Sequence, residues 1–208
     1  MNLPKNTQER WLKQLKSSES TEQLTALAKI GRSFFRLHEV AGRRDEWGPI
    51  RTDGDTKLEL SNSLKKSLID KLSSHDPDVR GASALALANW DDTEVIKSIS
   101  ALLEDPQPDV RLSAIQAMER MKSPEFLDHL FETAENDCEE LVQAHAISTI
   151  GKIISKENEE ANDTSGAVYT SGPVSAHEDL ERLTHIKNGD TSSYITFLAD
   201  QTIEHLTS

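Results

Sequence analysis

The sequence predicts an all-α fold of stacked antiparallel helix pairs, an α-solenoid. The first observation is that Asp78-Val79-Arg80 recurs as Asp109-Val110-Arg111, 31 residues later, after a proline-containing turn each time. The second is that an apolar pattern at helical spacing follows both copies. The third is the low content of turn formers, with only 9 Gly and 7 Pro in 208 residues, which argues against a β-barrel.

The helices that follow the triplets each have one apolar face. Steps of four, seven, eight and eleven residues from the valine bring side chains to the same side of a helix. These positions are Val79, Ser83, Ala86, Leu87 and Trp90, and then Val110, Ala114, Ala117, Met118 and Met121. Several of them are small, so we expect close contacts between neighbouring helices. We expect Asp78 and Asp109, just before the helices, to accept bonds from free backbone N–H groups.

The upstream helices repeat at the same offset, which gives the two-helix unit. Their apolar positions are Leu64, Leu68 and Leu72, then Val95, Ile99 and Leu103, then Phe126, Leu130 and Ala134. A third downstream helix follows with one extra residue in its turn, at Val142, Ala146, Thr149, Ile150 and Ile153. One helix pair cannot cover its own apolar stripe, so the pairs must stack. Residues 64–154 are therefore the predicted repeat core.

The segments outside this core have different patterns. Residues 1–40 predict two helices that cap one end of the stack, followed by a loop over 41–63. Residues 155–176 are acidic and rich in Ser, Thr and Gly, which is typical of a flexible linker. Residues 177–208 predict two short helices, the second with an apolar face that includes Tyr194 and Ile195. These helices either close the stack or dock on a partner.

The charge distribution favours a basic partner and argues against nucleic acid. Residues 1–44 hold nine Lys/Arg and four Asp/Glu, so +5, and the rest of the chain carries −13 − 5 = −18. An acidic body repels phosphates and attracts cationic surfaces, although solubility alone also explains such a charge. No apolar run of about 18 residues predicts a membrane span. The start lacks a secretion signal and Cys138 is the single cysteine, so we expect a cytoplasmic protein.

No pattern in the sequence indicates catalysis, a metal or a cofactor. Glycine-rich phosphate loops, His-Glu-x-x-His and Gly-x-Ser-x-Gly are all absent. A metal site from His129, Cys138 and His145 is conceivable, but scattered surface histidines are the more common explanation. The carboxylates at Asp91, Asp92 and Glu94 stand at a helix start, where capping explains them more simply than acid–base chemistry.

The run from Asp105 to Met118 resembles the short HEAT-like repeats of the phycobilisome-lyase type, and His75 to Leu87 resembles an eroded copy. The resemblance implies a polar ladder between neighbouring repeats, made by the Asp and Arg of the triplets. It also implies that the second helices line a concave surface. With the apolar face directed inward, the expected partner-binding positions are Leu85, Ala88, Leu112, Gln116, Glu119, Ala144 and Ser148.

The loop after residue 40 adds a second candidate binding element. It contains Arg43, Arg44 and Trp47, and Trp and Arg are common interface anchors, although an ordinary linker is the simpler explanation. Together these features predict a non-catalytic protein-interaction module, an adaptor or an inhibitor or immunity-type binder of a basic protein. The alternative is a subunit of a phycobilin-type chromophore lyase, for which no residue can be transferred as catalytic.

Overall fold

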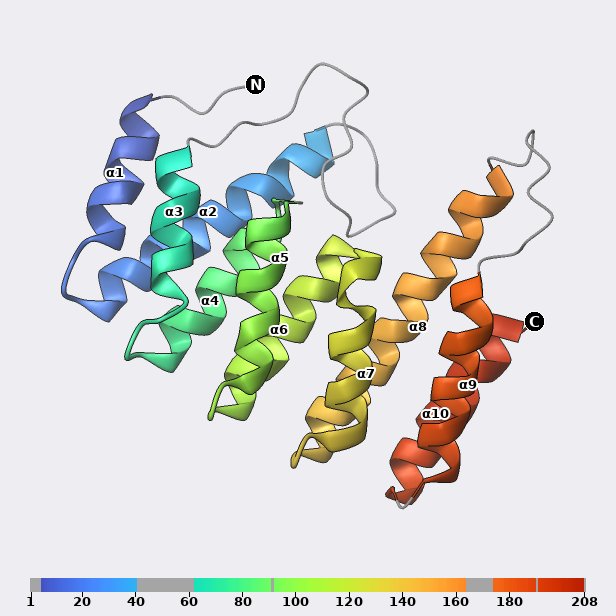
Figure 1. Cartoon of the computed structure of the whole chain (residues 1–208). Helices are drawn as coiled ribbons and strands as arrows, with labels where there is room; N and C mark the ends of the chain where they lie inside the picture. Colours follow the sequence, from blue (N-terminus) through green and yellow to red (C-terminus); the bar gives the residue numbers. More distant parts are fainter. Residues whose placement is uncertain (1–4, 41–61, 91, 164–173, 190, 208) are drawn as a thin grey trace. The chain divides into compact units, whose positions relative to one another are not determined.

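The computed structural model describes residues 5–40, 62–90, 92–163, 174–189 and 191–207, and within these ranges it contains helices and no strand. The chain divides into two compact units, residues 1–121 and 122–208. The boundary falls inside the predicted repeat core. Each unit consists of helix pairs, which confirms the predicted all-α solenoid class (Figure 1).

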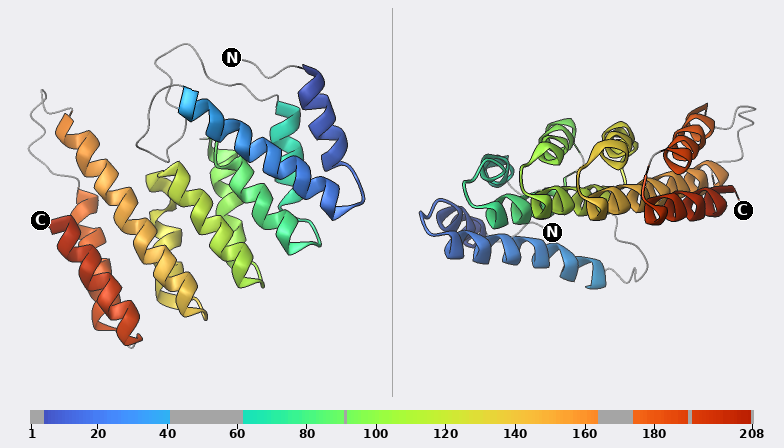
Figure 2. Two further views of the ribbon diagram at one scale, coloured as in Figure 1. Left: turned by 180° about the vertical axis from the view of Figure 1, so that it is seen from behind. Right: turned by 90° about the horizontal axis from the view of Figure 1, so that it is seen from below.

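The first unit contains three helix pairs. The pairs are α1 (Lys5–Leu15) with α2 (Ser20–Val40), α3 (Asn62–Lys71) with α4 (Pro77–Leu87), and α5 (Thr93–Ser100) with α6 (Pro108–Met121). A 3-10 turn, η1 (Ala101–Glu104), continues α5. Helices α3 and α5 form one layer, and α4 and α6 lie side by side in the other (Figure 2).

The predicted apolar faces form the core of this unit. Val79 and Val110, the valines of the triplets, are 0% and 1% exposed. The upstream helices contribute Leu64, Leu68, Val95 and Ile99, all fully buried. One position differs, because Leu102 is buried where Leu103 was expected. The 3-10 turn there has three residues per turn, so the apolar pattern shifts by one.

The start of α4 corrects the expected role of Asp78. The capping residue is Asp76. Its backbone is extended (φ −82°, ψ 117°), and its carboxylate accepts the N–H of Asp78 at 2.9 Å. Pro77 is the first helical residue, a position where its missing N–H costs nothing. Asp78 is therefore already inside the helix. Asp109 likewise follows the helical Pro108 rather than preceding the helix.

The second unit contains η2 (Pro124–Phe126), α7 (Leu127–Asn136), α8 (Glu140–Asp163), α9 (Val174–Asn188) and α10 (Ser193–Thr207). Helices α8 and α10 pack together in one layer, and α7 and α9 lie in the other layer (Figure 2). The core includes Phe126, Leu130, Val142 and Ile150, each 0% exposed, as the repeat pattern predicts.

Helix α8 is longer than the sequence predicts. It continues to Asp163, so residues 155–163 are helical rather than part of the linker. The stretch is acidic, which suggested a linker. However, it contains Lys, Glu and Ala, which are strong helix formers, and it contains no Gly or Pro. The two predicted C-terminal helices are present as α9 and α10.

No helix in the described ranges combines the length and apolar character needed to cross a membrane.

Candidate functional site

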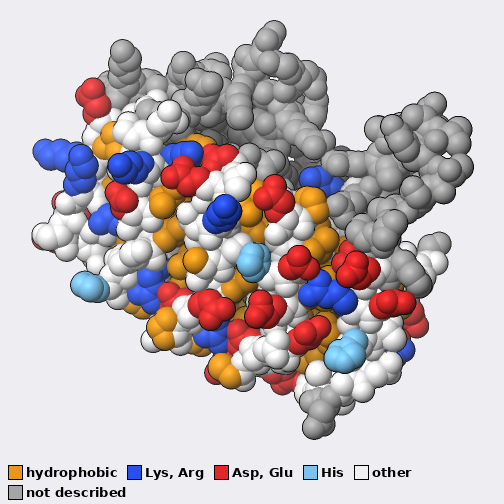
Figure 3. All heavy atoms as spheres, viewed as in Figure 1, with side chains coloured by type: hydrophobic (Ala, Val, Ile, Leu, Met, Phe, Trp, Pro, Cys, Tyr) orange, Lys and Arg blue, Asp and Glu red, His pale blue; other side chains and the backbone are white. Residues whose placement is uncertain are grey.

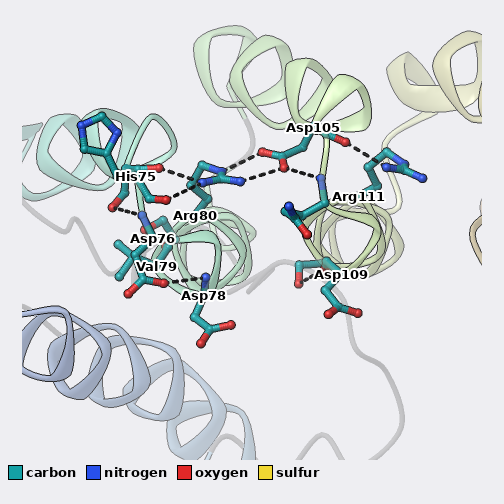
Figure 4. A network of polar contacts seen from close by, with 12 residues as sticks. His75, Asp76, Asp78, Val79, Arg80, Asp105, Asp109 and Arg111 are labelled. Carbon is teal, nitrogen blue, oxygen red and sulfur yellow. Dashed lines mark hydrogen bonds and ion pairs between the residues drawn. The ribbon is translucent and has the colours of Figure 1, made fainter.

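A buried ion pair joins the second and third helix pairs of the first unit (Figure 4). The Arg80 guanidinium binds Asp105 through both carboxylate oxygens, Nε to Oδ2 at 2.7 Å and Nη2 to Oδ1 at 2.8 Å. The two side chains are 13% and 7% exposed. Arg80 also donates to the carbonyls of Ser74 and His75, so it fixes its own turn as well.

Asp105 is bound from several sides. Its carboxylate accepts the N–H of Gln107 at 2.9 Å, and its carbonyl accepts Arg111 Nη1 at 2.9 Å. Burial raises the pKa of Asp105, but the hydrogen bonds from Arg80 and Gln107 and the nearby guanidinium charges outweigh it and lower the pKa below its usual value. The carboxylate is thus held ionised in a structural role.

This arrangement modifies the expected ladder. The two arginines of the triplets take part, but the acidic member is Asp105, four residues before Asp109. Asp105 lies in the turn that faces the preceding repeat, whereas Asp78 and Asp109 are exposed. Position in the turn, rather than membership of the triplet, decides which carboxylate reaches the arginine.

The partner-binding positions expected in the first unit lie on the second helices α4 and α6, except Ala88, which is the C-cap residue of α4. Leu85, Leu112 and Glu119 are half-buried, Gln116 is exposed and Ala88 is buried. The loop residues Arg43, Arg44 and Trp47 lie outside the described residues.

Glycines bring second helices into close contact in both units. A Cβ added to Gly81 of α4 would come within 2.8 Å of Ser113 Oγ on α6, and one added to Gly151 of α8 within 2.8 Å of Thr202 Cγ2 on α10. Ala88 follows Gly81 by seven residues, and Ala144 precedes Gly151 by seven residues. At this spacing each alanine lies on the same side of its helix as the glycine. Ala88 and Ala144 are only 4% and 5% exposed, so they belong to the packing between helices, where a partner has little access.

The second unit has an exposed apolar feature, which includes Tyr194 of the predicted C-terminal helix. Among the described residues, the large hydrophobic side chains that are exposed are Leu141, Tyr194 and Phe197, at 57%, 51% and 54%. All three belong to α8 and α10. The sequence placed Tyr194 on one apolar face with Ile195, which either closes the stack or docks on a partner, but the buried face of α10 is formed by Ile195 and Ala199. A stretch of mixed apolar residues does not by itself fix which side of a short helix is covered.

The second unit also holds nearly all of the net negative charge. Residues 122–208 contain 17 Asp/Glu and 5 Lys/Arg, so 5 − 17 = −12 of the total −13. Acidic side chains gather over α7 and α9 in Figure 3, and the exposed ones there include Asp128, Glu132, Glu135, Glu178 and Glu181. Arg182 lies among them, bound to Asp128 at 2.7 Å and stacked on Phe131 at 4.0 Å.

The described residues form no group of three or more His, Cys, Asp or Glu side chains placed to hold a metal ion, and His129, Cys138 and His145 do not assemble one. The acidic helix start behaves as a cap, since Asp92 accepts the N–H of Val95 at 3.1 Å. Asp91 lies outside the described residues.

Residues 66–151 match the family model of HEAT repeats. The match runs from within α3 to within α8. It supports HEAT repeats in general and does not single out the phycobilisome-lyase type. No curated protein matches the chain.

Two solved structures are similar to nearly the whole chain at low sequence identity. An engineered protein of the Northeast Structural Genomics Consortium is 18% identical, with 98% of this chain and 97% of that chain covered and a TM-score of 0.50. A designed armadillo repeat protein is 15% identical, with 95% and 98% covered and a TM-score of 0.46. At 18% identity the likeness to the engineered protein concerns the fold alone.

Proposed function

We propose that this chain is a cytoplasmic, non-catalytic protein-interaction module, an adaptor or inhibitor that binds a basic partner protein. The observation that carries the proposal is the charge of the second unit, 17 acidic against 5 basic residues, on a HEAT-type scaffold. Stacked helix pairs offer a long outer surface, and an acidic surface attracts cationic proteins and speeds their association.

The exposed parts of the second helices supply contact residues for this role. Gln116 and Ser148 are exposed, and Leu85, Leu112 and Glu119 are half-buried, so these remain proposed contacts. Arg43, Arg44 and Trp47 remain proposed as well. Nothing in the fold or in the comparisons favours the chromophore-lyase alternative.

The test is affinity capture with the full chain, identification of retained proteins by mass spectrometry, and titration of the purified candidate by calorimetry. One variant replaces four exposed glutamates of the second unit with glutamine: Glu125, Glu132, Glu135 and Glu178. A matched control replaces four exposed glutamates of the first unit: Glu9, Glu19, Glu22 and Glu104.

We expect a basic protein to bind stoichiometrically, with an affinity that falls as salt rises. The second-unit variant should bind at least about tenfold more weakly and the control should stay within about threefold, because the charges act over roughly a Debye length. Failure of every captured protein to bind in purified form, or equal loss in both variants, would overturn the proposal.

A further inference from the structure

The surface of the second unit formed by α8 and α10 combines apolar and acidic features. Its exposed side chains on α8 follow one stripe, from Leu141 through Ser148 to Lys152. On α10 the exposed stripe runs through Tyr194, Phe197 and Gln201. We call this the α8–α10 face.

Two contacts hold the helices of this face in parallel register. At one end the Ser192 hydroxyl donates to the Glu140 carboxylate, immediately before Leu141 and two residues before Tyr194. At the other end Thr202 lies directly over Gly151. Leu141 and Tyr194 therefore stand within one turn of the same junction, and Phe197 follows Tyr194 by three residues on the same side of α10.

Exposure of three large apolar side chains at one end of a helix pair has a cost in water unless something covers them. The side chains next to them are acidic, with exposed Glu139 and Glu140 directly before Leu141. The nearest lysine along the α8 stripe is Lys152, about three turns further on. A ligand for this end must therefore bring both apolar groups and positive charge.

From this combination we infer that the α8–α10 face docks a basic amphipathic segment of a partner protein, with Leu141, Tyr194 and Phe197 as its apolar contacts. The inference deepens the proposed function, because it names the surface and the chemistry of the partner. A second copy of the chain fits poorly, since its own second unit carries −12 and would be repelled. Lys and Arg side chains of the partner meet the Glu139 and Glu140 end, while its apolar side chains cover the aromatic rings.

The test uses two labelled helical peptides with the same number of lysines, one with leucines at its apolar positions and one with glutamines there. Binding to the full chain is measured by fluorescence anisotropy at several salt concentrations. The difference between the peptides isolates apolar contact from general attraction to an acidic protein. The variant Y194S/F197S removes two rings, and the control T184A/N188A changes two exposed residues of the neighbouring helix α9, outside the α8–α10 face.

We expect the leucine peptide to bind at least about tenfold more tightly than the glutamine peptide, as for interface anchors that are buried on binding. In Y194S/F197S that ratio should fall below about threefold while the glutamine peptide binds as before, and T184A/N188A should match the wild type. Circular dichroism confirms that each variant is folded.

Three results would overturn the inference. The first is a ratio near one in the wild type, and the second is a ratio that Y194S/F197S leaves unchanged. The third is a wild-type dimer in sedimentation equilibrium that Y194S/F197S dissociates, because the face would then bind a second copy. If a captured partner binds but the leucine peptide does not compete with it, this inference fails and the proposed function stands. If the leucine peptide binds more tightly than the glutamine peptide but no captured protein binds in purified form, this inference stands and the proposed function fails.

Discussion

Arg80 and Asp105 form a bidentate ion pair between two successive helix pairs, with both side chains almost fully covered. Arg80 lies in α4, and Asp105 lies in the turn before α6. The ion pair therefore fixes the position of one helix pair relative to the next. Such a pair contributes little net free energy compared with apolar packing, but removal of one partner leaves a buried charge uncompensated.

The first prediction concerns the loss of this charge. D105N should lower the free energy of unfolding by about 2 kcal/mol, because Arg80 keeps its carbonyl acceptors at Ser74 and His75 but loses its counter-charge. Urea denaturation followed by circular dichroism measures the change. D109N, at an exposed position of the triplet, should stay within about 0.5 kcal/mol. Equal effects of the two variants would show that the ion pair has no structural role.

The second prediction concerns pH. The pKa of Asp105 is lowered in the folded state, so the unfolded chain binds the proton more readily. The stabilisation is therefore fully present above the unfolded value, about pH 4, and is lost as pH falls through the lower folded pKa. The stability gap between wild type and D105N should be constant from pH 7 to 5 and shrink below about pH 4. The pKa values of Asp76 and Asp92 are also lowered, so only this difference isolates Asp105. A gap that is unchanged at pH 3 would contradict the assignment.

These residues also show where the sequence was informative and where it was not. The helix pairs and the inward valines followed from periodicity, because burial of one helix face imposes a spacing of apolar residues that is visible in the order of the sequence. The pairing of Arg80 with Asp105 depends on how a turn folds back toward the previous repeat, which is not encoded in the spacing of the triplets. The exposure of Tyr194 depends on what lies beside α10, and a single helix does not specify its neighbours.

The third prediction separates a helix cap from an ion pair at the start of α5. Asp92 accepts the N–H of Val95 through one oxygen and binds Lys65 Nζ at 3.0 Å through the other. D92N keeps the capping oxygen and loses the charge, whereas D92A loses both. We expect D92A to lower the free energy of unfolding by about 1 kcal/mol and D92N by less than about 0.5 kcal/mol, since caps contribute more than exposed ion pairs.

Thermal or urea denaturation of both Asp92 variants gives the comparison. E94Q, which removes the other carboxylate bound to Lys65, serves as the ion-pair control and should match D92N. If D92N lost as much stability as D92A, the stabilisation would come from the ion pair between Asp92 and Lys65 rather than from the cap.

The fourth prediction tests the close contact between α8 and α10. In G151A the new Cβ would stand 2.8 Å from Thr202 Cγ2, and Thr202 cannot rotate freely because its hydroxyl donates to the carbonyl of Leu198 at 2.8 Å. Overpacking costs about 1–3 kcal/mol, and the better helix propensity of alanine offsets about 1 kcal/mol of it. G151A should therefore be less stable by about 1 kcal/mol.

T202S provides the matched rescue, because serine keeps the hydroxyl and removes the methyl group that the new Cβ would meet. G151A/T202S should recover the loss seen in G151A, and T202S alone should change stability by less than about 1 kcal/mol. Urea denaturation of the three variants measures the coupling between the two sites. Simple additivity would mean that α8 and α10 do not meet at this point, and the parallel register of α8 and α10 would lose one of its two supports.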